Sequence, residues 1–199
     1  MREPVVYGEF ERRDGVLFRR KCFLQWGSST KSIGAFVGLN PGAADFLGGH
    51  QELEQRMVGE LRLDHTLRQL VRLIRHIHGD EPEGRVHVYN LFSLKDPQSA
   101  SAVNQLQQVR DTYSPVEDEI STHELQEHPW LLLAWGLDRS ETILKSKDRW
   151  LDTIRQSGVP FFGKLHPKKN DYYHLCPRLQ SDRDILLDDL VNEYKQISY

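Results

Sequence analysis

Four short apolar runs, separated by longer segments with helical spacing, constrain the fold of this chain more than any other feature. They lie at residues 32–39, 85–92, 130–136 and 159–167. Continuous apolar runs of this length are typical of strands that are buried on both faces, as in parallel sheets. Between the first two runs, residues 51–78 repeat leucine, valine and isoleucine at three- and four-residue spacing, which predicts an amphipathic helix. Strands that alternate with helices predict an α/β fold.

The segment before the first run has a different pattern. Arg13-Asp14-Gly15 joins two β-prone stretches, and Asp-Gly in that setting is a strong hairpin signal. The 199 residues suit one domain with a sizeable core. We therefore predict a single domain over residues 1–199, with a three-layer α/β/α fold and a mostly parallel four-stranded central sheet. An N-terminal β-hairpin within residues 1–30 precedes this sheet and packs on it. Further helical patterns lie at residues 102–127, 139–157 and 181–197.

Composition limits the classes of function. The net charge of −3 argues mildly against a nucleic-acid role, although one basic face is enough for brief contact with DNA. No apolar run is long enough to span a membrane, and the first fifteen residues lack the apolar region of a signal peptide. We therefore expect a cytoplasmic protein, and separately we expect it to be a monomer. The two cysteines, Cys22 and Cys176, are far apart, and the nine histidines show no zinc spacing, so we predict neither a metal nor another cofactor.

Polar or glycine-rich signals follow each of the four predicted strands. Ligands of open parallel sheets bind beyond the carboxyl ends of the strands, so these signals should meet in one crevice. Each signal alone is also an ordinary turn or capping feature, and the expected convergence is what indicates a site. The signals are Asn40-Pro41-Gly42, Asn90, Trp135-Gly136 and His166-Pro167.

The same four segments resemble motifs of the uracil-DNA glycosylase superfamily. The likeness spans residues 36–167 and is nearest to the mismatch-specific thymine/uracil glycosylases and the single-strand-selective type. The chain resembles still more closely a group of bacterial and phage proteins with Asn-Pro-Ser-x-Ala-Asp, Asn-Leu-Phe, Ala-Trp-Gly and His-Pro motifs. The matching segments are VGLNPG (37–42), VYNLFSL (88–94), LLLAWG (131–136) and KLHPKK (164–169).

This resemblance implies a monofunctional DNA glycosylase that hydrolyses the N-glycosidic bond of a flipped-out pyrimidine. Asn40 would hold the attacking water, and because an amide is no base, its effect would be positional. His166 would donate to the base carbonyl, and Asn90 would contact the edge of the base. Asp45 would either activate the water or cap the following helix, and both alternatives remain open.

The base pocket implied by the resemblance is lined by small and apolar residues. Phe46 would stack on the base or pack in the core, and both alternatives remain open. Gly42-Ala43-Ala44 leaves space where some relatives carry a bulky aromatic, so a 5-substituted or otherwise modified pyrimidine is favoured over strict uracil. The other expected base-binding residues are Gly38, Leu39 and Pro41.

The segment after His166 is expected to contact DNA, single- or double-stranded. Lys168 and Lys169 would bind phosphates, and Tyr172 or Tyr173 would fill the space left by the flipped base. Two other functions remain as alternatives: a non-catalytic module that binds nucleic acid or protein, and a hydrolase of free nucleosides or nucleotides. The biological setting would be DNA repair or defence against phages with modified DNA.

Overall fold

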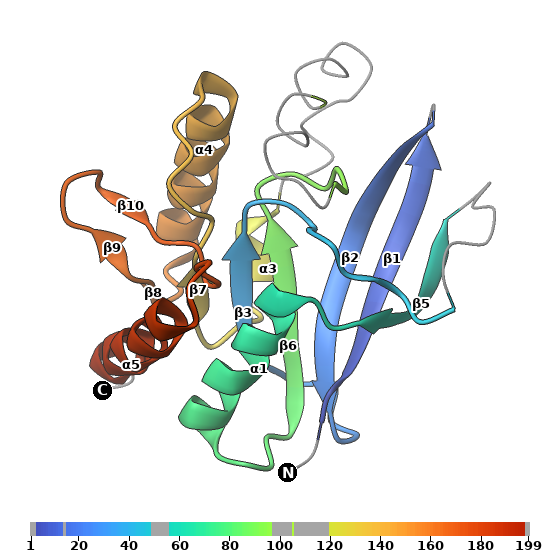
Figure 1. Ribbon diagram of the computed structural model, residues 1–199, viewed down its shortest axis with the longest axis horizontal. Helices are drawn as coiled ribbons and strands as arrows, with labels where there is room; N and C mark the ends of the chain where they lie inside the picture. Colours follow the sequence, from blue (N-terminus) through green and yellow to red (C-terminus); the bar gives the residue numbers. More distant parts are fainter. Residues whose placement is uncertain (1–2, 14, 49–55, 97–104, 106–119, 198–199) are drawn as a thin grey trace.

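The computed structural model describes residues 3–13, 15–48, 56–96, 105 and 120–197. One eight-stranded mixed sheet with the order β4-β5-β1-β2-β6-β3-β7-β8 organises this part of the chain (Figure 1). Its strands are β1 (Val5–Arg13), β2 (Val16–Trp26), β3 (Ser32–Gly38), β4 (Asp45–Phe46), β5 (Met57–Arg62), β6 (Gly84–Asn90), β7 (Leu131–Leu133) and β8 (Phe161–Phe162). The described helices are α1 (His65–His78), α3 (Thr122–Leu125), α4 (Glu141–Ser157) and α5 (Gln180–Ile197).

The predicted fold, a mostly parallel four-stranded sheet in three layers, is wrong. Strands β6, β3, β7 and β8 do pair in parallel. However, β2 pairs with β6 in antiparallel fashion and continues the same sheet into β1, β5 and β4, also antiparallel. The N-terminal hairpin is therefore part of the central sheet. Local patterns identified the hairpin but carried no information on this long-range pairing.

The predicted helix over residues 51–78 is also wrong in its first part. Residues 51–55 lie outside the described residues, and Met57–Arg62 form strand β5, which pairs with β1. The helix begins only after Asp64, whose side chain accepts a hydrogen bond from the backbone nitrogen of Leu67 and so caps α1. Gly59 of β5 lies against Phe46, where an added Cβ would come within 2.8 Å of the ring. This close approach requires a glycine in the strand.

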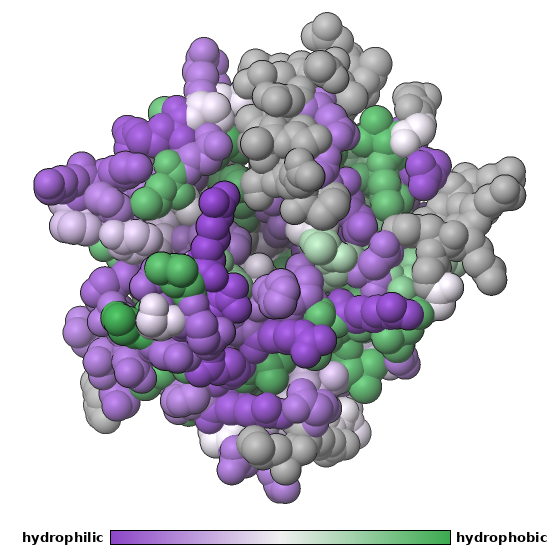
Figure 2. Space-filling view, viewed as in Figure 1, coloured by the Kyte–Doolittle hydropathy of each residue, from purple (hydrophilic) through white to green (hydrophobic). Residues whose placement is uncertain are grey.

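Helices cover both faces of the sheet. On one face, α1 and α5 contribute Leu70, Ile74 and Leu187 to a core that also contains Val86 of β6. On the other face, α3 and α4 pack over β3 and β7 through a second core. Figure 2 shows the face with α1 and α5, where hydrophilic side chains predominate and apolar ones gather over the strands on the right.

The predicted fourth strand, residues 159–167, is divided in two. Its first part is β8 in the main sheet, and its second part is β9 (Leu165–His166), which pairs with β10 (Asp171–Tyr172). This hairpin projects at the left of Figure 1, away from the carboxyl ends of β3 and β6. Of the predicted helices at 102–127, only α3 lies in the described residues; residues 102–104 and 106–119 lie outside them.

Candidate functional site

Two of the four strand-end signals meet at the carboxyl edge of the parallel strands. Gly38 at the end of β3 pairs with Asn90 at the end of β6. When the Asn90 amide is oriented so that each atom meets a complementary partner, its nitrogen donates to the backbone oxygens of Asn40 (3.0 Å) and Tyr89 (3.3 Å). Its oxygen accepts from Nη2 of Arg19 at 3.3 Å. The Asn40 side chain donates to the Asp96 backbone oxygen at 2.8 Å, so both amides are held in place.

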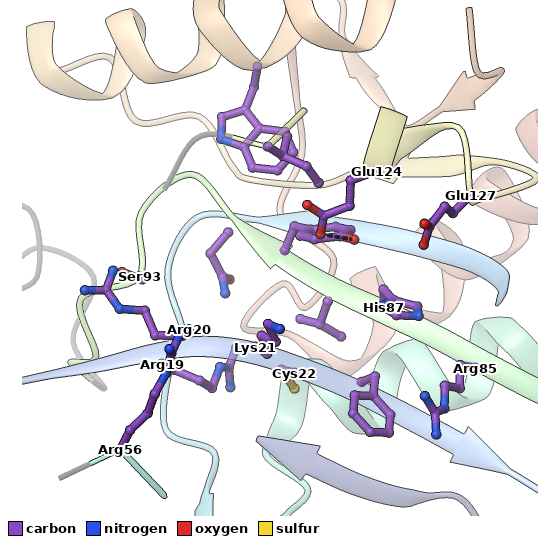
Figure 3. A pocket seen from close by; sticks show the side chains of 16 residues that line it. Arg19, Arg20, Lys21, Cys22, Arg56, Arg85, His87, Ser93, Glu124 and Glu127 are labelled. Carbon is purple, nitrogen blue, oxygen red and sulfur yellow. Dashed lines mark hydrogen bonds between the residues drawn. The ribbon is translucent and has the colours of Figure 1, made fainter. Parts of the chain in front are cut away.

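A cavity of about 480 Å³ opens beside Asn90, where strands β2 and β6 separate. The β2–β6 ladder ends at the pair Phe23–His87, and beyond it the two strands diverge (Figure 3). The volume lies within the range of about 300–1,000 Å³ that is typical of ligand pockets. We call this space the split cavity. It is lined by Arg19, Arg20, Lys21, Cys22, Phe23, Arg56, Arg85, His87, Val88, Tyr89, Asn90, Ser93, Ile120, Glu124, Glu127 and Trp150.

The lining of the split cavity combines cations with aromatic rings. Its five arginine and lysine side chains exceed its two glutamates, although Glu11 of β1 pairs with Arg20 at 2.9 Å and Glu9 pairs with Arg56. Tyr89 and Trp150 lie with their ring centroids 5.9 Å apart on one wall. Cations beside aromatic rings suit nucleic acids, whose phosphates are anionic and whose bases stack.

Arg19 is the most unusual residue of this lining. It is only 4% exposed, and its Nε and Nη1 have no hydrogen-bond partner among the described residues. Sequence reasoning missed it, because Arg19-Arg20-Lys21 in a hairpin strand is typical of an exposed surface. Burial comes from a distant segment: the backbone of Ser93 accepts from that of Arg19 at 2.8 Å, and Phe18 bridges to Leu94.

A hydrogen-bonded chain of side chains begins at Tyr89 on the same wall of the split cavity. The Tyr89 hydroxyl donates to Glu124 at 3.0 Å and lies 2.9 Å from Nε2 of His128, whose Nδ1 lies 2.8 Å from the Ser32 hydroxyl. Burial and, to a lesser extent, the neighbouring His87 together lower the pKa of His128 to about 4. Burial and the neighbouring Glu124 raise the pKa of Tyr89. Both groups are therefore uncharged at neutral pH, and the chain forms a fixed polar wall.

The loop after β3 packs tightly against the start of α1. Leu39, Pro41 and Ala44 are buried, whereas Ala43 is exposed. Gly42 has a φ of +63°, and an added Cβ would lie 3.0 Å from Oδ2 of Asp64, the cap of α1. The small side chains at this loop therefore serve packing at least in part, and the space they were expected to leave for a base substituent stays a prediction.

Asp45 and Phe46 lie in the short edge strand β4 and not at a helix start. Oδ1 of Asp45 accepts from the backbone of Phe46 at 2.8 Å, and Oδ2 lies 3.5 Å from Nζ of Lys95. The alternative of Asp45 as a helix cap is thus wrong, because Asp64 holds that place. Phe46 is buried against Phe10, with ring centroids 4.7 Å apart. Its role on a flipped base stays a prediction.

His166 lies in β9, which pairs with β10 in a two-stranded sheet apart from the main one (Figure 1). Its Nδ1 accepts from the backbone of Lys168 at 3.1 Å, so a neutral ring carries its proton on Nε2. The imidazole ring of His166 packs on the ring of Tyr173, and the two ring centroids lie 5.1 Å apart. The role of His166 beside the base stays a prediction.

The expected DNA-binding residues share this hairpin. Lys168 and Lys169 are exposed at its turn, followed by Asn170 with a φ of +48°. Tyr172 packs edge-on against Trp135, with the ring centroids 5.5 Å apart. Burial raises the pKa of Tyr172. The lysines are accessible to phosphates, whereas Tyr172 contributes to packing; the DNA contacts themselves stay predictions.

Two findings on the described residues concern metal sites and membrane-spanning helices. Within residues 3–13, 15–48, 56–96, 105 and 120–197, no group of three or more His, Cys, Asp or Glu side chains is arranged to hold a metal ion. In the same part of the chain, no helix combines the length and apolar character that crossing a membrane requires.

Comparison with known proteins adds no relative. No family model, no curated protein and no solved structure matches this chain.

Proposed function

We propose that the protein is a monofunctional DNA glycosylase that releases a uracil-type pyrimidine from DNA. The observation that supports this most is the contact between Asn40 and Asn90 at the carboxyl ends of adjacent parallel strands, with Asn90 open to the cationic split cavity. Carboxyl ends of parallel strands are where such sheets bind ligands. The resemblance of both segments to glycosylase motifs supports the same function.

The orientation of Asn90 favours one class of base. Both amide hydrogens are directed at the backbone oxygens of Asn40 and Tyr89, so the amide offers the ligand only its oxygen. An acceptor pairs with the N3–H of uracil, thymine and 5-substituted uracils, whereas cytosine carries an acceptor at N3. We therefore propose uracil-type bases, with cytosine rejected because two acceptors would face each other.

The remaining steps follow from the positions of the neighbouring groups. The base enters the split cavity, and the cations at its rim bind the adjacent phosphates. Asn40 holds a water near the sugar, and Asp45 is the carboxylate nearest to it in sequence and takes up its proton. Enzymes that act on a base must take it out of the stack, and a pocket of this volume can receive it.

The test is release of the base from synthetic DNA. Oligonucleotides carrying uracil, a thymine mismatch, 5-substituted uracils, cytosine or 5-methylcytosine are incubated with the protein and cleaved with alkali at abasic sites. We expect cleavage at uracil-type bases and none at cytosine. If no oligonucleotide is cleaved by folded protein, in single- or double-stranded form, the proposed function is wrong. A preference for 5-substituted uracil would favour defence against phages with modified DNA over repair.

A second function, binding of nucleic acid without catalysis, is favoured by one observation. His166, the residue expected to donate to the departing base, lies on a hairpin that is not part of the main sheet. A gel shift of the same oligonucleotides without any alkali-labile site would identify this alternative.

A further inference from the structure

Arg19 presents an unsatisfied positive charge inside the protein. Its side chain is 4% exposed, and Nε and Nη1 have no hydrogen-bond partner in the described residues, while Nη2 donates to the Asn90 oxygen. In the same described part, no carboxylate forms an ion pair with Arg19; Glu11 of the neighbouring strand pairs with Arg20 and Arg13. Arg19 and Asn90 line the same cavity.

Such a group is costly to the folded protein. A guanidinium remains protonated at any pH that proteins meet, so Arg19 cannot relieve its burial by losing its charge. Buried donors without acceptors and buried charges without partners both lower stability. Unsatisfied polar groups of this kind are typical of functional sites, where the missing partner is supplied by a ligand. The partner that fits a buried guanidinium is an oxygen that carries negative charge.

We propose that Arg19 forms an anion subsite that binds a pyrimidine base in its deprotonated form, through a carbonyl oxygen next to the edge held by Asn90. The proposal rests on the proposed function and goes beyond it, because it assigns the stabilisation of the departing base to β2 and not to His166. The four other cations of the cavity, Arg20, Lys21, Arg56 and Arg85, suit the phosphates. A flat base reaches a side chain as deeply buried as Arg19 more readily than a phosphodiester backbone does.

The subsite acts on the step that breaks the glycosidic bond. The bond between the sugar carbon C1′ and the base nitrogen N1 breaks, and its electron pair passes to the base, which spreads the charge onto its carbonyl oxygens. The oxygen of water bonds to C1′, and the proton of that water goes to Asp45 or to solvent. The guanidinium of Arg19 interacts more strongly with the anion than with the neutral base, so it lowers the barrier. The released base anion then takes a proton from solvent.

The experiment compares wild type with Arg19→Met, and uses Arg155→Met on α4 as the matched control, because Arg155 is exposed and pairs with Asp152. Single-turnover release is measured for thymine, uracil and the more acidic 5-fluorouracil. We expect Arg19→Met to slow release of thymine by about 100-fold or more and of 5-fluorouracil much less, because an acidic base needs less help. The thermal midpoint of Arg19→Met should equal or exceed that of wild type, since an unpaired buried charge is removed.

A binding readout separates the subsite from catalysis. 5-Nitrouracil is a much stronger acid than uracil, and its absorbance, followed as the pH is lowered, reports the ionised fraction when bound. We expect wild type to lower the pKa of bound 5-nitrouracil by about 1 to 3, and Arg19→Met to abolish this shift. If wild type releases bases but Arg19→Met slows all bases equally and keeps the shift, the subsite is wrong and the glycosylase stands. If wild type releases no base but shows the Arg19-dependent shift, the glycosylase is wrong and the subsite stands. If wild type neither releases a base nor shifts the pKa of bound 5-nitrouracil, the glycosylase and the subsite are both wrong.

Discussion

Nζ of Lys147 lies 2.6 Å from Oδ2 of Asp171, and both side chains are almost completely buried, at 4% and 7% exposure. The same ammonium donates to the backbone oxygens of Gly136 (2.7 Å) and Asp138 (2.8 Å). Oδ1 of Asp171 accepts from the indole of Trp135 at 2.8 Å. One ion pair thus connects helix α4, the end of β7 and the β9–β10 hairpin. Burial lowers the pKa of Lys147, although the carboxylate of Asp171 opposes this.

Asp171→Ala should destabilise the protein strongly, because it leaves Lys147 buried without a counter-charge. We expect the free energy of unfolding in urea to fall by about 3–5 kcal/mol. Lys145→Ala, which removes the exposed pair with Glu141 on the same helix, should change it by less than about 1 kcal/mol. Similar effects of the two substitutions would show that the buried pair does not hold the hairpin.

Stability should fall in acid because of His128. Its pKa is about 4 in the folded protein, against an ordinary 6.5, so the fold favours the neutral ring. This contribution to the free energy of unfolding is fully present above pH 6.5 and is lost as the pH falls from 6.5 through 4. The loss is on the order of 3 kcal/mol. His87 and Tyr89 lie against the ring and are present in both variants.

The check is the free energy of unfolding of wild type and His128→Gln from pH 7 to pH 4. The loss between these limits should be markedly smaller in His128→Gln than in wild type. His123→Gln, a substitution of an exposed histidine on α3, should retain the wild-type pH profile. Parallel profiles for wild type and His128→Gln would contradict the assignment.

Gly42→Ala should be destabilising in the loop that leads to the site. The position has a φ of +63°, and the new methyl group would lie 3.0 Å from the carboxylate that caps α1. We expect a loss of about 1–2 kcal/mol in the free energy of unfolding. Gly48→Ala in the same loop region meets nothing within 4 Å and should cost no more than about 0.5 kcal/mol. Equal costs would show that the backbone at Gly42 is not strained by a side chain.

Lys21 should contribute to DNA affinity through phosphate contact. It is exposed at the rim of the split cavity on β2. Lys21→Gln should weaken binding equally for all sequences and reduce the slope of log affinity against log salt concentration by about 1. Lys145→Gln on α4 lies away from the cavity lining and should leave the slope unchanged. An unchanged slope in Lys21→Gln would place the phosphates elsewhere, for example at Lys168 and Lys169.

Local patterns predicted the elements that local forces determine. The Asp-Gly hairpin, the buried strand β3 and the helix α4, which ends at Gly158 in the left-handed region, all form as expected. The failures are non-local. Residues 57–62 continue the leucine spacing of α1, yet they pair with β1, and the only local sign of a boundary is the cap at Asp64. Likewise, nothing near β2 in sequence predicts that it pairs with β6.

The candidate site, like the fold, was predictable only in part. The rule that ligands bind at strand carboxyl ends led to Asn40 and Asn90, and the structure does bring the two into contact. The same rule failed to place His166, because its segment leaves the main sheet and pairs with β10. Arg19 was missed because its burial depends on Ser93, more than seventy positions away along the chain.

The most direct measurement of the central claim is the single-turnover rate of uracil release by Asn40→Ala and Asn90→Ala, with circular dichroism to verify folding. Asn192→Ala on the exposed side of α5 is the matched control. We expect both site variants to lose at least about 100-fold in rate while the control retains the wild-type rate. Wild-type rates in folded Asn40→Ala and Asn90→Ala would contradict it.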